Sequence, residues 1–286
     1  MGKKTKLGLV IAGLALVLAA VAVSAVLGFF LPQEELKRQF PMWEIAAVQE
    51  DAGDGQLDMR LVGMFYETSG TREQPFDSLW IQVENSGSWE VVSSVDFQIE
   101  FLFRGIWYTV YRPEEGPDYD QRIEPRATTK VSFSVPSGLL EPEGEYRLSM
   151  DGLGFCGLDV IFQKEEFAEW YESEPEQEQN SDVQMTLAGI DYDVANGDNP
   201  YDEIQITLKN NGDEEFYYED GYEIQYDYQD RWYTIKRGSG LLASFTVLKP
   251  GEEKEEFYTL PHGFLAKEGK FRVYQESVGY CELTEK

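Results

Sequence analysis

The sequence has little histidine, little cysteine and few basic residues, and each shortage excludes a class of site. His262 is the only histidine, which excludes a zinc site with several histidines. Because it lies in a turn beside a proline and a glycine, we do not expect it to form a catalytic triad either. The 286 residues carry 24 lysines and arginines against 53 acidic residues, a net charge of −29. A surface this negative repels phosphate backbones and anionic headgroups, so we expect neither nucleic-acid binding nor peripheral docking on lipid.

The most prominent feature present is an internal repeat. The segment Phe97–Val110, FQIEFLFRGIWYTV, returns as Tyr222–Ile235, YEIQYDYQDRWYTI, at a spacing of 125 positions. The first strand of each copy, Leu57–Glu67 and Val183–Asp193, matches at 126. Landmarks at the common spacing are Trp107 and Trp232, Pro125 and Pro250, Gly144 and Gly269, Arg147 and Arg272, and Cys156 and Cys281. Equal spacing predicts equal strand order in two single-core units.

Apolar and polar residues alternate along both copies, which is the pattern of a strand with one buried face. With 14% aromatic residues and frequent glycine and proline, the composition also favours a β-rich fold. In the first copy we expect strands at Leu57–Tyr66, Ser78–Glu84, Phe97–Phe103, Ile106–Tyr111, Thr128–Val135, Glu145–Met150 and Phe155–Phe162. Seven short strands with turns between them predict a sandwich.

These motifs resemble a known family. The order VENSG or LKNNG, an aromatic strand, Trp-Tyr-Thr, a proline turn and Gly-x-[Tyr/Phe]-Arg is similar to bacterial immunoglobulin-like domains of Gram-positive envelope proteins. The resemblance covers both copies and implies two tandem immunoglobulin-like β-sandwiches, without catalytic residues. Leu140–Tyr146 also resembles the tyrosine corner of such domains; because the second copy has Phe271 there, we expect packing alone to hold its corner.

The two cysteines occupy equivalent positions, one in each copy. No disulfide can therefore form within a copy, and the usual bridge between the sheets of an immunoglobulin domain is absent. Either both thiols are unpaired, or Cys156 and Cys281 meet across the copies, which requires their Cα atoms to lie within about 7 Å. We favour unpaired, mostly buried thiols.

The N-terminus predicts a membrane anchor. Residues 1–6 include three lysines, residues 7–31 carry no charge, and two glutamates follow Pro32. The uncharged run is long enough to span a bilayer, and the positive-inside rule places residues 1–6 in the cytoplasm and the remainder outside. A cleavable signal peptide is the alternative, with a passable site at Val23–Ala25, but the run is longer than an ordinary signal core.

Two polar segments flank the first copy, which we place at residues 56–163. We expect a stalk at 32–55, in which Trp43 lies near the headgroups or packs on the first domain. We expect an acidic linker at 164–181 before the second copy at 182–286. In that linker Phe167, Trp170 and Tyr171 have the spacing that aligns them on one face of a short helix. That face either packs on its own domain or contacts a partner.

Three patterns that suggest a cofactor, a metal or glycoside hydrolysis have simpler explanations. Gly152–Gly157 fits a dinucleotide turn, but it lies between two strands instead of opening a helix. Asp191–Asp198 resembles the start of a calcium loop, but its glycine is one position late and Asp202 replaces the expected glutamate. Paired carboxylates carry no information in a chain with 53 acidic residues. We predict no cofactor, no metal and no enzymatic activity.

Trp80 is the residue that we single out as a partner contact. Leu79, Ile81 and Val83 share one face of their strand, and because their counterparts are apolar too, that face is the core. Trp80 then points outward, where the second copy has Gln205. Its indole is either covered by the linker aromatics or a loop, or it is a docking residue for a protein or glycan, with Trp170 and Tyr171 as further candidates.

The sequence predicts a single-pass cell-membrane protein that presents two immunoglobulin-like domains outside the cell. Its expected function is non-catalytic binding or sensing at the cell surface; the alternative is a structural spacer or an accessory subunit of an envelope complex. An exposed apolar patch on one domain favours binding over the spacer. No cluster of residues in the sequence identifies the protein or glycan that is bound.

Overall fold

The fold is all-β, as predicted, apart from a helical turn at 34–37 and a 3₁₀ turn, η1 (Phe264–Ala266). The computed structural model describes residues 34–47, 57–71, 74–94, 96–114, 120–150, 153–173, 179–194, 200–238 and 245–283. Within these ranges no helix is both long enough and apolar enough to cross a membrane. The predicted anchor, residues 7–31, lies outside them.

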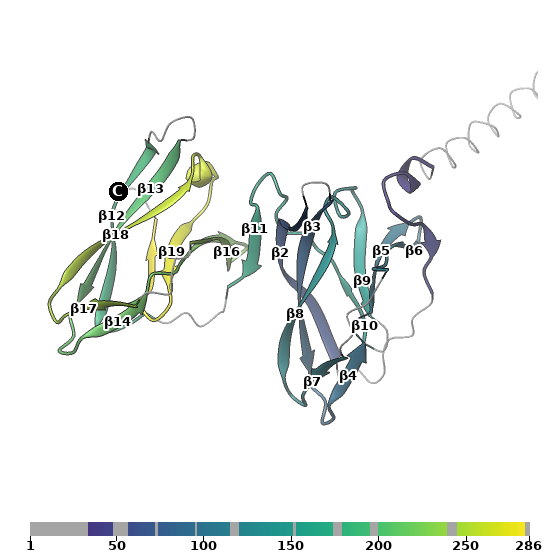
Figure 1. The fold of residues 1–286 in the computed structure, drawn as a ribbon, viewed down its shortest axis with the longest axis horizontal. Coiled ribbons are helices and arrows are strands. Elements are labelled where there is room, and N and C mark those ends of the chain that lie inside the picture. The colour runs from purple at the N-terminus through teal and green to yellow at the C-terminus, as the bar shows by residue number, and fades with distance from the viewer. Residues whose placement is uncertain are drawn as a thin grey trace, which may run out of the picture. The chain divides into compact units, whose positions relative to one another are not determined.

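The chain divides into two compact units. Most of their strands are labelled in Figure 1. Unit 1 comprises Met1–Arg60, Val83–Thr129 and Val135–Asp159, and unit 2 comprises Leu61–Gln82, Lys130–Ser134 and Val160–Lys286. Strands β2 (Leu57–Thr71), β3 (Gln74–Asn85) and β8 (Thr128–Pro136) each belong partly to one unit and partly to the other. The boundaries of the units therefore cut through the first copy of the repeat.

Unit 1 contains a five-stranded antiparallel sheet in the order β1-β6-β5-β9-β10 and a two-stranded ribbon of β4 and β7. Its strands are β1 (Glu44–Ile45), β4 (Val91–Ser94), β5 (Phe97–Phe103), β6 (Ile106–Tyr111), β7 (Asp120–Ile123), β9 (Glu145–Met150) and β10 (Gly154–Gly157). The bounds of β5, β6 and β9 are those that the alternating pattern predicts. Ile99, Val110 and Leu148 are fully buried in its core.

Part of the expected stalk is a strand of this sheet. β1 pairs with β6, Glu44 lying opposite Thr109. The ring of Trp43 stacks on Tyr108 at a centroid distance of 4.6 Å, and Phe40 is buried against Phe101 at 5.3 Å. Of the two positions considered for Trp43, the structure shows the one packed on the first copy.

Unit 2 contains the eight-stranded sheet β20-β19-β15-β16-β11-β2-β3-β8, the three-stranded sheet β12-β13-β18 and the ribbon of β14 and β17. Its remaining strands are β11 (Glu169–Glu172), β12 (Val183–Val194), β13 (Tyr201–Asn210), β14 (Phe216–Glu219), β15 (Tyr222–Tyr228), β16 (Arg231–Gly238), β17 (Phe245–Leu248), β18 (Glu253–Pro261), β19 (Phe271–Gln275) and β20 (Gly279–Glu282).

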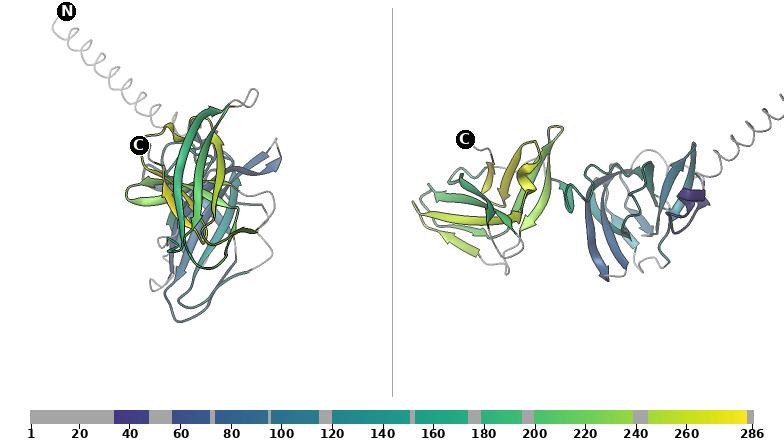
Figure 2. Two further views of the ribbon diagram at one scale, coloured as in Figure 1. Left: turned by 90° about the vertical axis from the view of Figure 1, so that its left-hand side faces the viewer. Right: turned by 90° about the horizontal axis from the view of Figure 1, so that it is seen from above.

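The strands of residues 179–283 form a β-sandwich, whose two layers can be followed in green to yellow in Figure 2. Ile204, Ile206 and Leu208 of β13 are fully buried in one layer, as the apolar face of that strand predicts. Tyr222 of β15 and Tyr258 of β18 join the layers, with ring centroids 4.2 Å apart. The Tyr258 hydroxyl also reaches Gln275 Oε1 of β19 at 3.3 Å.

Both copies keep the same buried asparagine at the end of an equivalent strand. Asn85 Nδ2 donates to the carbonyl oxygens of Trp89, Ile123 and Glu124 at 2.8 to 3.2 Å, and its Oδ1 accepts from Gly87 N. Asn210 repeats this arrangement with the carbonyls of Glu214 and Leu248 and with Gly212 N. Because a buried amide is costly unless it is hydrogen-bonded, these matched contacts show that the repeat extends to its polar core.

The tyrosine corner is present in both copies, with the hydroxyl on different strands. In the first copy Tyr146 Oη donates to the Pro142 carbonyl at 2.7 Å, as the motif implies. In the second copy Tyr226, which lies opposite Phe271 on the neighbouring strand, donates to the Glu268 carbonyl at 2.8 Å. The prediction that packing alone holds this corner is wrong, because the aromatic pair has exchanged its phenylalanine and tyrosine between strands.

Candidate functional site

Strand β11 lies where the sequence predicts a short helix, and that prediction is wrong. β11 pairs on one side with β2, where Trp170 lies opposite Met64, and on the other with β16, where Tyr171 lies opposite Thr234. The spacing of the aromatic residues fits a helix, but hydrogen bonds to two distant strands decide the conformation. β11 thus joins strands of both copies into the eight-stranded sheet of unit 2.

In a strand, neighbouring side chains point to opposite faces, so Trp170 and Tyr171 have different environments. The Trp170 side chain is fully buried, with its ring 6.0 Å from Phe162 and 6.1 Å from Tyr233. A partner cannot reach it, which corrects its prediction as a contact residue. Phe167 is buried as well, beside Tyr226 at 5.7 Å. Tyr171 is partly exposed on the other face of the sheet.

The close approach of β2 and β11 depends on a glycine. A Cβ atom at Gly63 would lie 2.5 Å from Tyr171 Cβ and 2.9 Å from the Trp170 carbonyl oxygen. Real Cβ atoms essentially never approach other atoms so closely, so any larger residue would push β11 away. The counterpart Gly189 has no such neighbour, and its nearest contact would be Gln205 Oε1 at 3.8 Å.

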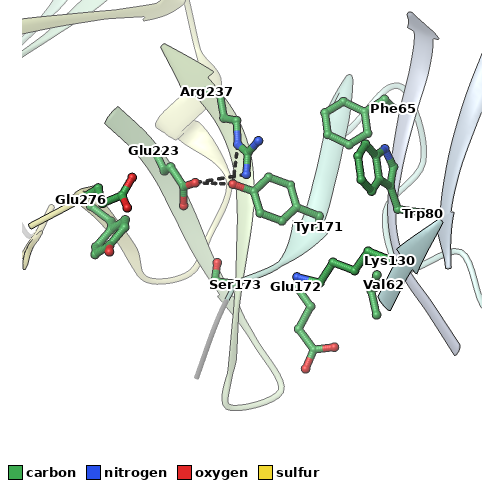
Figure 3. A pocket seen from close by; sticks show the side chains of 11 residues that line it. Val62, Phe65, Trp80, Lys130, Tyr171, Glu172, Ser173, Glu223, Arg237 and Glu276 are labelled. Atoms are coloured by element: carbon green, nitrogen blue, oxygen red, sulfur yellow. Dashed lines mark hydrogen bonds and ion pairs between the residues drawn. The ribbon is translucent and has the colours of Figure 1, made fainter. Parts of the chain in front are cut away.

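A groove of about 300 Å³ follows this face of the sheet in unit 2 (Figure 3). Its apolar end is formed by Val62 and Phe65 of β2 and by Trp80 of β3, and Tyr171 of β11 extends it. The rings of Phe65 and Tyr171 are nearly parallel at 6.2 Å, and those of Phe65 and Trp80 are 6.0 Å apart. Two of the three predicted contact residues, Trp80 and Tyr171, therefore line one hollow.

Tyr171 is held by a polar network at the middle of the groove. Its hydroxyl donates to Glu223 of β15 and accepts from Arg237 Nε of β16 at 2.6 Å, as the dashed lines in Figure 3 show. The guanidinium also lies 4.1 Å from the centre of the Tyr171 ring. Burial, followed by the charge of Glu223, raises the pKa of Tyr171 well above its ordinary value. The phenol therefore keeps its proton and serves as a fixed donor.

The far end of the groove is acidic. Glu276, just beyond β19, lines it together with Tyr274, and an adjoining hollow of about 270 Å³ adds Glu219. Among the residues that the structure describes, the carboxylates of Glu219 and Glu276 have no hydrogen-bond or ion-pair partner. Burial, followed by Glu276 and Glu223, raises the pKa of Tyr274. The groove therefore runs from an aromatic end to a negatively charged end.

The Glu223 carboxylate lies in the groove because the glutamate and the glutamine of its strand occupy each other's positions when compared with the first copy. In β15 Gln225 Nε2 donates to Glu223 at 2.9 Å; in β5 Gln98 Nε2 donates to Glu100 at 2.9 Å. The same pair is retained, but the carboxylate and the amide have changed places. In the first copy the carboxylate is fully buried and paired with Arg147 at 2.6 Å. In the second copy the carboxylate faces the groove, and the neutral amide accepts from Arg272.

The aromatic end of the groove has no equivalent in the second copy. Gln205 replaces Trp80, and Asp191 replaces Phe65. Gln205 Nε2 donates to Asp191 Oδ2 at 2.7 Å, so this face is polar there. A duplicated scaffold that carries aromatic residues at only one of two equivalent faces indicates a role for them beyond the fold.

Sequence reasoning missed Glu223, Arg237 and Glu276, because polar residues of this kind are common on strands throughout the chain. One signal could have located β11. The pattern Phe-x-x-Trp occurs at Phe40–Trp43 and again at Phe167–Trp170. The strands that follow, β1 and β11, pair with equivalent threonines of β6 and β16. The recurrence therefore marks the first strand of each copy, within segments that look like a stalk and a linker.

The remaining candidate motifs have structural contacts. Gly154–Gly157 of the glycine pattern is strand β10. His262 Nδ1 lies 3.0 Å from Asp202 Oδ1, and the buried Asp202 also accepts from the backbone nitrogens of Asp193 and Gly263. The calcium-like loop continues into 195–199, outside the described residues. The described residues contain no group of three or more metal-binding side chains that could hold an ion.

The two cysteines are unpaired in the structure, as predicted. Cys156 is buried, and burial raises the pKa of its thiol to about 12. Cys281 is partly exposed, and burial raises its thiol pKa as well. Because the thiolate is the reactive form, both thiols are poor nucleophiles near neutral pH.

An apolar surface is also exposed on the ribbon of β14 and β17 in the second copy. Tyr217 and Phe245 are 56% and 66% exposed, and Val247, which lies opposite Tyr217, is 39% exposed. In the first copy the positions of Phe245 and Val247 are occupied by Asp120 and Arg122. The two copies thus differ in surface chemistry at a second place.

Comparison with known proteins finds a family that the second copy resembles. Residues 179–285 match the family described as bacterial Ig-like domain, a segment of less than half the chain. No curated protein matches the chain. Among solved structures, the chain is similar to red sea bream transglutaminase at 7% identity and a TM-score of 0.24, over 82% of this chain and 32% of that one. The chain spans about a third of that structure, and a score this low carries no argument. Residues 179–285 are therefore similar to bacterial immunoglobulin-like domains.

Proposed function

We propose that this protein is a non-catalytic binding or sensing protein of a bacterial cell surface, anchored by residues 7–31 and presenting two immunoglobulin-like copies outside. The observation that carries the proposal is the aromatic end of the groove. Phe65, Trp80 and Tyr171 converge on one sheet face, and the equivalent positions of Phe65 and Trp80 in the second copy are polar. Partly exposed aromatic residues beside fixed polar groups are the usual composition of a recognition surface.

The alternative function is a structural spacer or an accessory subunit of an envelope complex. A spacer needs only folded copies with polar faces. The spacer role therefore does not explain why one of two equivalent faces carries aromatic residues. The ribbon residue Phe245, which is 66% exposed, also favours binding, because the first copy has Asp120 at its position in the sequence. We therefore prefer the binding role to the spacer role.

The binding role is tested with the full-length chain in nonionic detergent, used as bait for envelope extracts and compared with two variants. Trp80→Gln installs the residue of the second copy in the groove, and Gln205→Ala is the control at the equivalent position. We expect at least one captured molecule that Trp80→Gln loses and Gln205→Ala keeps. Identical capture by all three chains, together with unchanged stability, would support the spacer instead.

The stability of Trp80→Gln shows whether its effect on binding is direct. Trp80 is only partly buried, so we expect the variant to lose less than about 3 kcal/mol, the lower bound for truncating a fully buried tryptophan. A larger loss would identify a core residue and end the docking role of Trp80. Topology is tested separately with external protease on intact cells. Protection of the immunoglobulin-like copies would refute the surface location.

A further inference from the structure

The charges along the groove indicate what kind of ligand fits it. Among the described residues that line its two hollows are four glutamates, Glu172, Glu219, Glu223 and Glu276, and two basic residues, Lys130 and Arg237. The groove therefore has an excess of two negative charges, in a chain whose net charge is −29. Both the local and the overall charge attract a cation and repel an anion.

Both basic residues of the groove, Lys130 and Arg237, already have partners. Arg237 pairs with Glu223 at 3.4 Å, donates to the Tyr171 hydroxyl and stacks on its ring. An anionic ligand would have to break this network before it could use the guanidinium. Glu219 and Glu276, in contrast, have no hydrogen-bond or ion-pair partner among the described residues, so a cation can pair with them without displacing a protein group.

The opposite end of the groove needs an apolar group. Val62, Phe65 and Trp80 form an apolar wall there, with Lys130 beside Val62 in Figure 3, and a ligand that covers this wall removes aromatic surface from water. A neutral sugar could stack on this wall, but it would leave the two carboxylates of the acidic end uncompensated. A ligand with an apolar part and a positive charge satisfies both ends at once.

We infer that the groove binds a basic segment of polypeptide, in which an apolar side chain lies on Phe65 and Trp80 while a lysine or arginine side chain pairs with Glu276 and Glu219. This inference rests on the proposed binding function and names its ligand class. The two adjoining hollows, of about 300 and 270 Å³, provide separate pockets for the two side chains, as in other modes of peptide recognition.

The test uses the full-length chain in nonionic detergent and a fluorescent, terminally blocked hexapeptide in which leucine alternates with lysine. Matched peptides carry acetyl-lysine or glutamate in place of lysine, and chitohexaose serves as a neutral glycan. We expect saturable binding of the lysine peptide, weaker binding of its acetylated form and none of the glutamate peptide. Because exposed charges are screened by salt, raising the salt concentration should weaken the binding of the lysine peptide.

Four variants locate the binding site. An exposed ion pair contributes at most about 1 kcal/mol, so Glu276→Gln should weaken the binding of the lysine peptide by about two- to fivefold. Glu276→Gln combined with Glu219→Gln should weaken this binding further. Glu255→Gln removes an exposed carboxylate of β18 that does not line the groove, and it should have no effect beyond the small change in net charge. Trp80→Gln should weaken the binding of the lysine peptide and of the acetyl-lysine peptide by the same factor, because it removes only apolar contact.

Several outcomes would overturn the inference. These are equal affinity for the lysine and acetyl-lysine peptides, equal effects of Glu276→Gln and Glu255→Gln, or no binding of the lysine peptide. If chitohexaose bound, or if the acetylated peptide bound as tightly as the lysine peptide, and Trp80→Gln abolished that binding, the groove would remain a binding site and the proposed function would stand, while the cationic ligand class would fail. If no probe bound and capture from envelope extracts were independent of Trp80, both would fail.

Discussion

Substituting Gly63 tests how far the groove depends on the junction between β2 and β11. Gly63→Ala places a methyl group 2.5 Å from Tyr171 Cβ and 3.0 Å from Tyr171 Cα, and both atoms are fixed by the pairing of β11 with its neighbours. No rotation of a side chain can relieve these contacts, so β11 must move. Overpacking of this kind costs about 1–3 kcal/mol. Movement of β11 would also disturb Trp170, which is fully buried on the opposite face.

Gly189→Ala is the matched control, because it makes the same change at the equivalent position with nothing closer than 3.8 Å. Glycine within a strand is destabilising by roughly 0.5–1 kcal/mol relative to alanine, so this variant should be neutral or slightly stabilised. Thermal unfolding followed by tryptophan fluorescence measures both. Each kcal/mol lost should lower Tm by about 2–4 °C in a unit of this size. Equal Tm values for the two variants would refute the argument that β2 and β11 approach too closely for a Cβ atom.

Four further predictions follow from the structure. Tyr226→Phe should lose about 0.5–1.5 kcal/mol of stability in urea unfolding, and adding Phe271→Tyr should recover it if the corner accepts a hydroxyl from either strand. Burial raises the pKa of Tyr171, Tyr258 and Tyr274 in the folded chain above their unfolded value of about 10. The protonated hydroxyls therefore contribute fully to stability below pH about 10, and this contribution is lost as the pH rises through the folded pKa values. Absorbance titration should show unfolding and tyrosine ionisation together above pH about 10. Iodoacetamide at pH 8 should label Cys281 before Cys156, and faster labelling of Cys156 would contradict its burial. Non-reducing mass spectrometry should find no bond between the cysteines; a linked Cys156–Cys281 peptide would contradict the structure.

The sequence predicts those parts of the fold whose residues act locally. The alternating pattern locates β5, β6 and β9 to the residue, and in β5 and β9 the alternate residues that it marks as apolar are mostly buried. It also identifies Leu79, Ile81 and Val83 as core residues and directs Trp80 to the other face, where the structure places it in the groove. These assignments need only the period of two that every strand shares.

The sequence does not predict features that depend on distant partners. β11 has four residues, and only its pairing with β2 and β16 makes it a strand, so local spacing suggested a helix instead. The acidic end of the groove could not be predicted, because Glu219 and Glu276 resemble dozens of other glutamates until the fold places them beside the same hollow. The hydroxyl of the second tyrosine corner was missed for a related reason: Tyr226 lies on a strand adjacent to the one that carries the motif.

The pairing of β11 has a consequence for how the chain folds. Tyr171 pairs with Gly63, far earlier in the chain, and with Thr234, far later. Closing loops of such length costs entropy before any contact is gained, so β11 can dock only after strands of both copies have formed. Once docked, it couples them, because opening either neighbouring strand removes hydrogen bonds from β11 itself. Native-state hydrogen exchange should then find the amides of β11, β2 and β16 opening together, as one cooperative unit that crosses the boundary between the two copies.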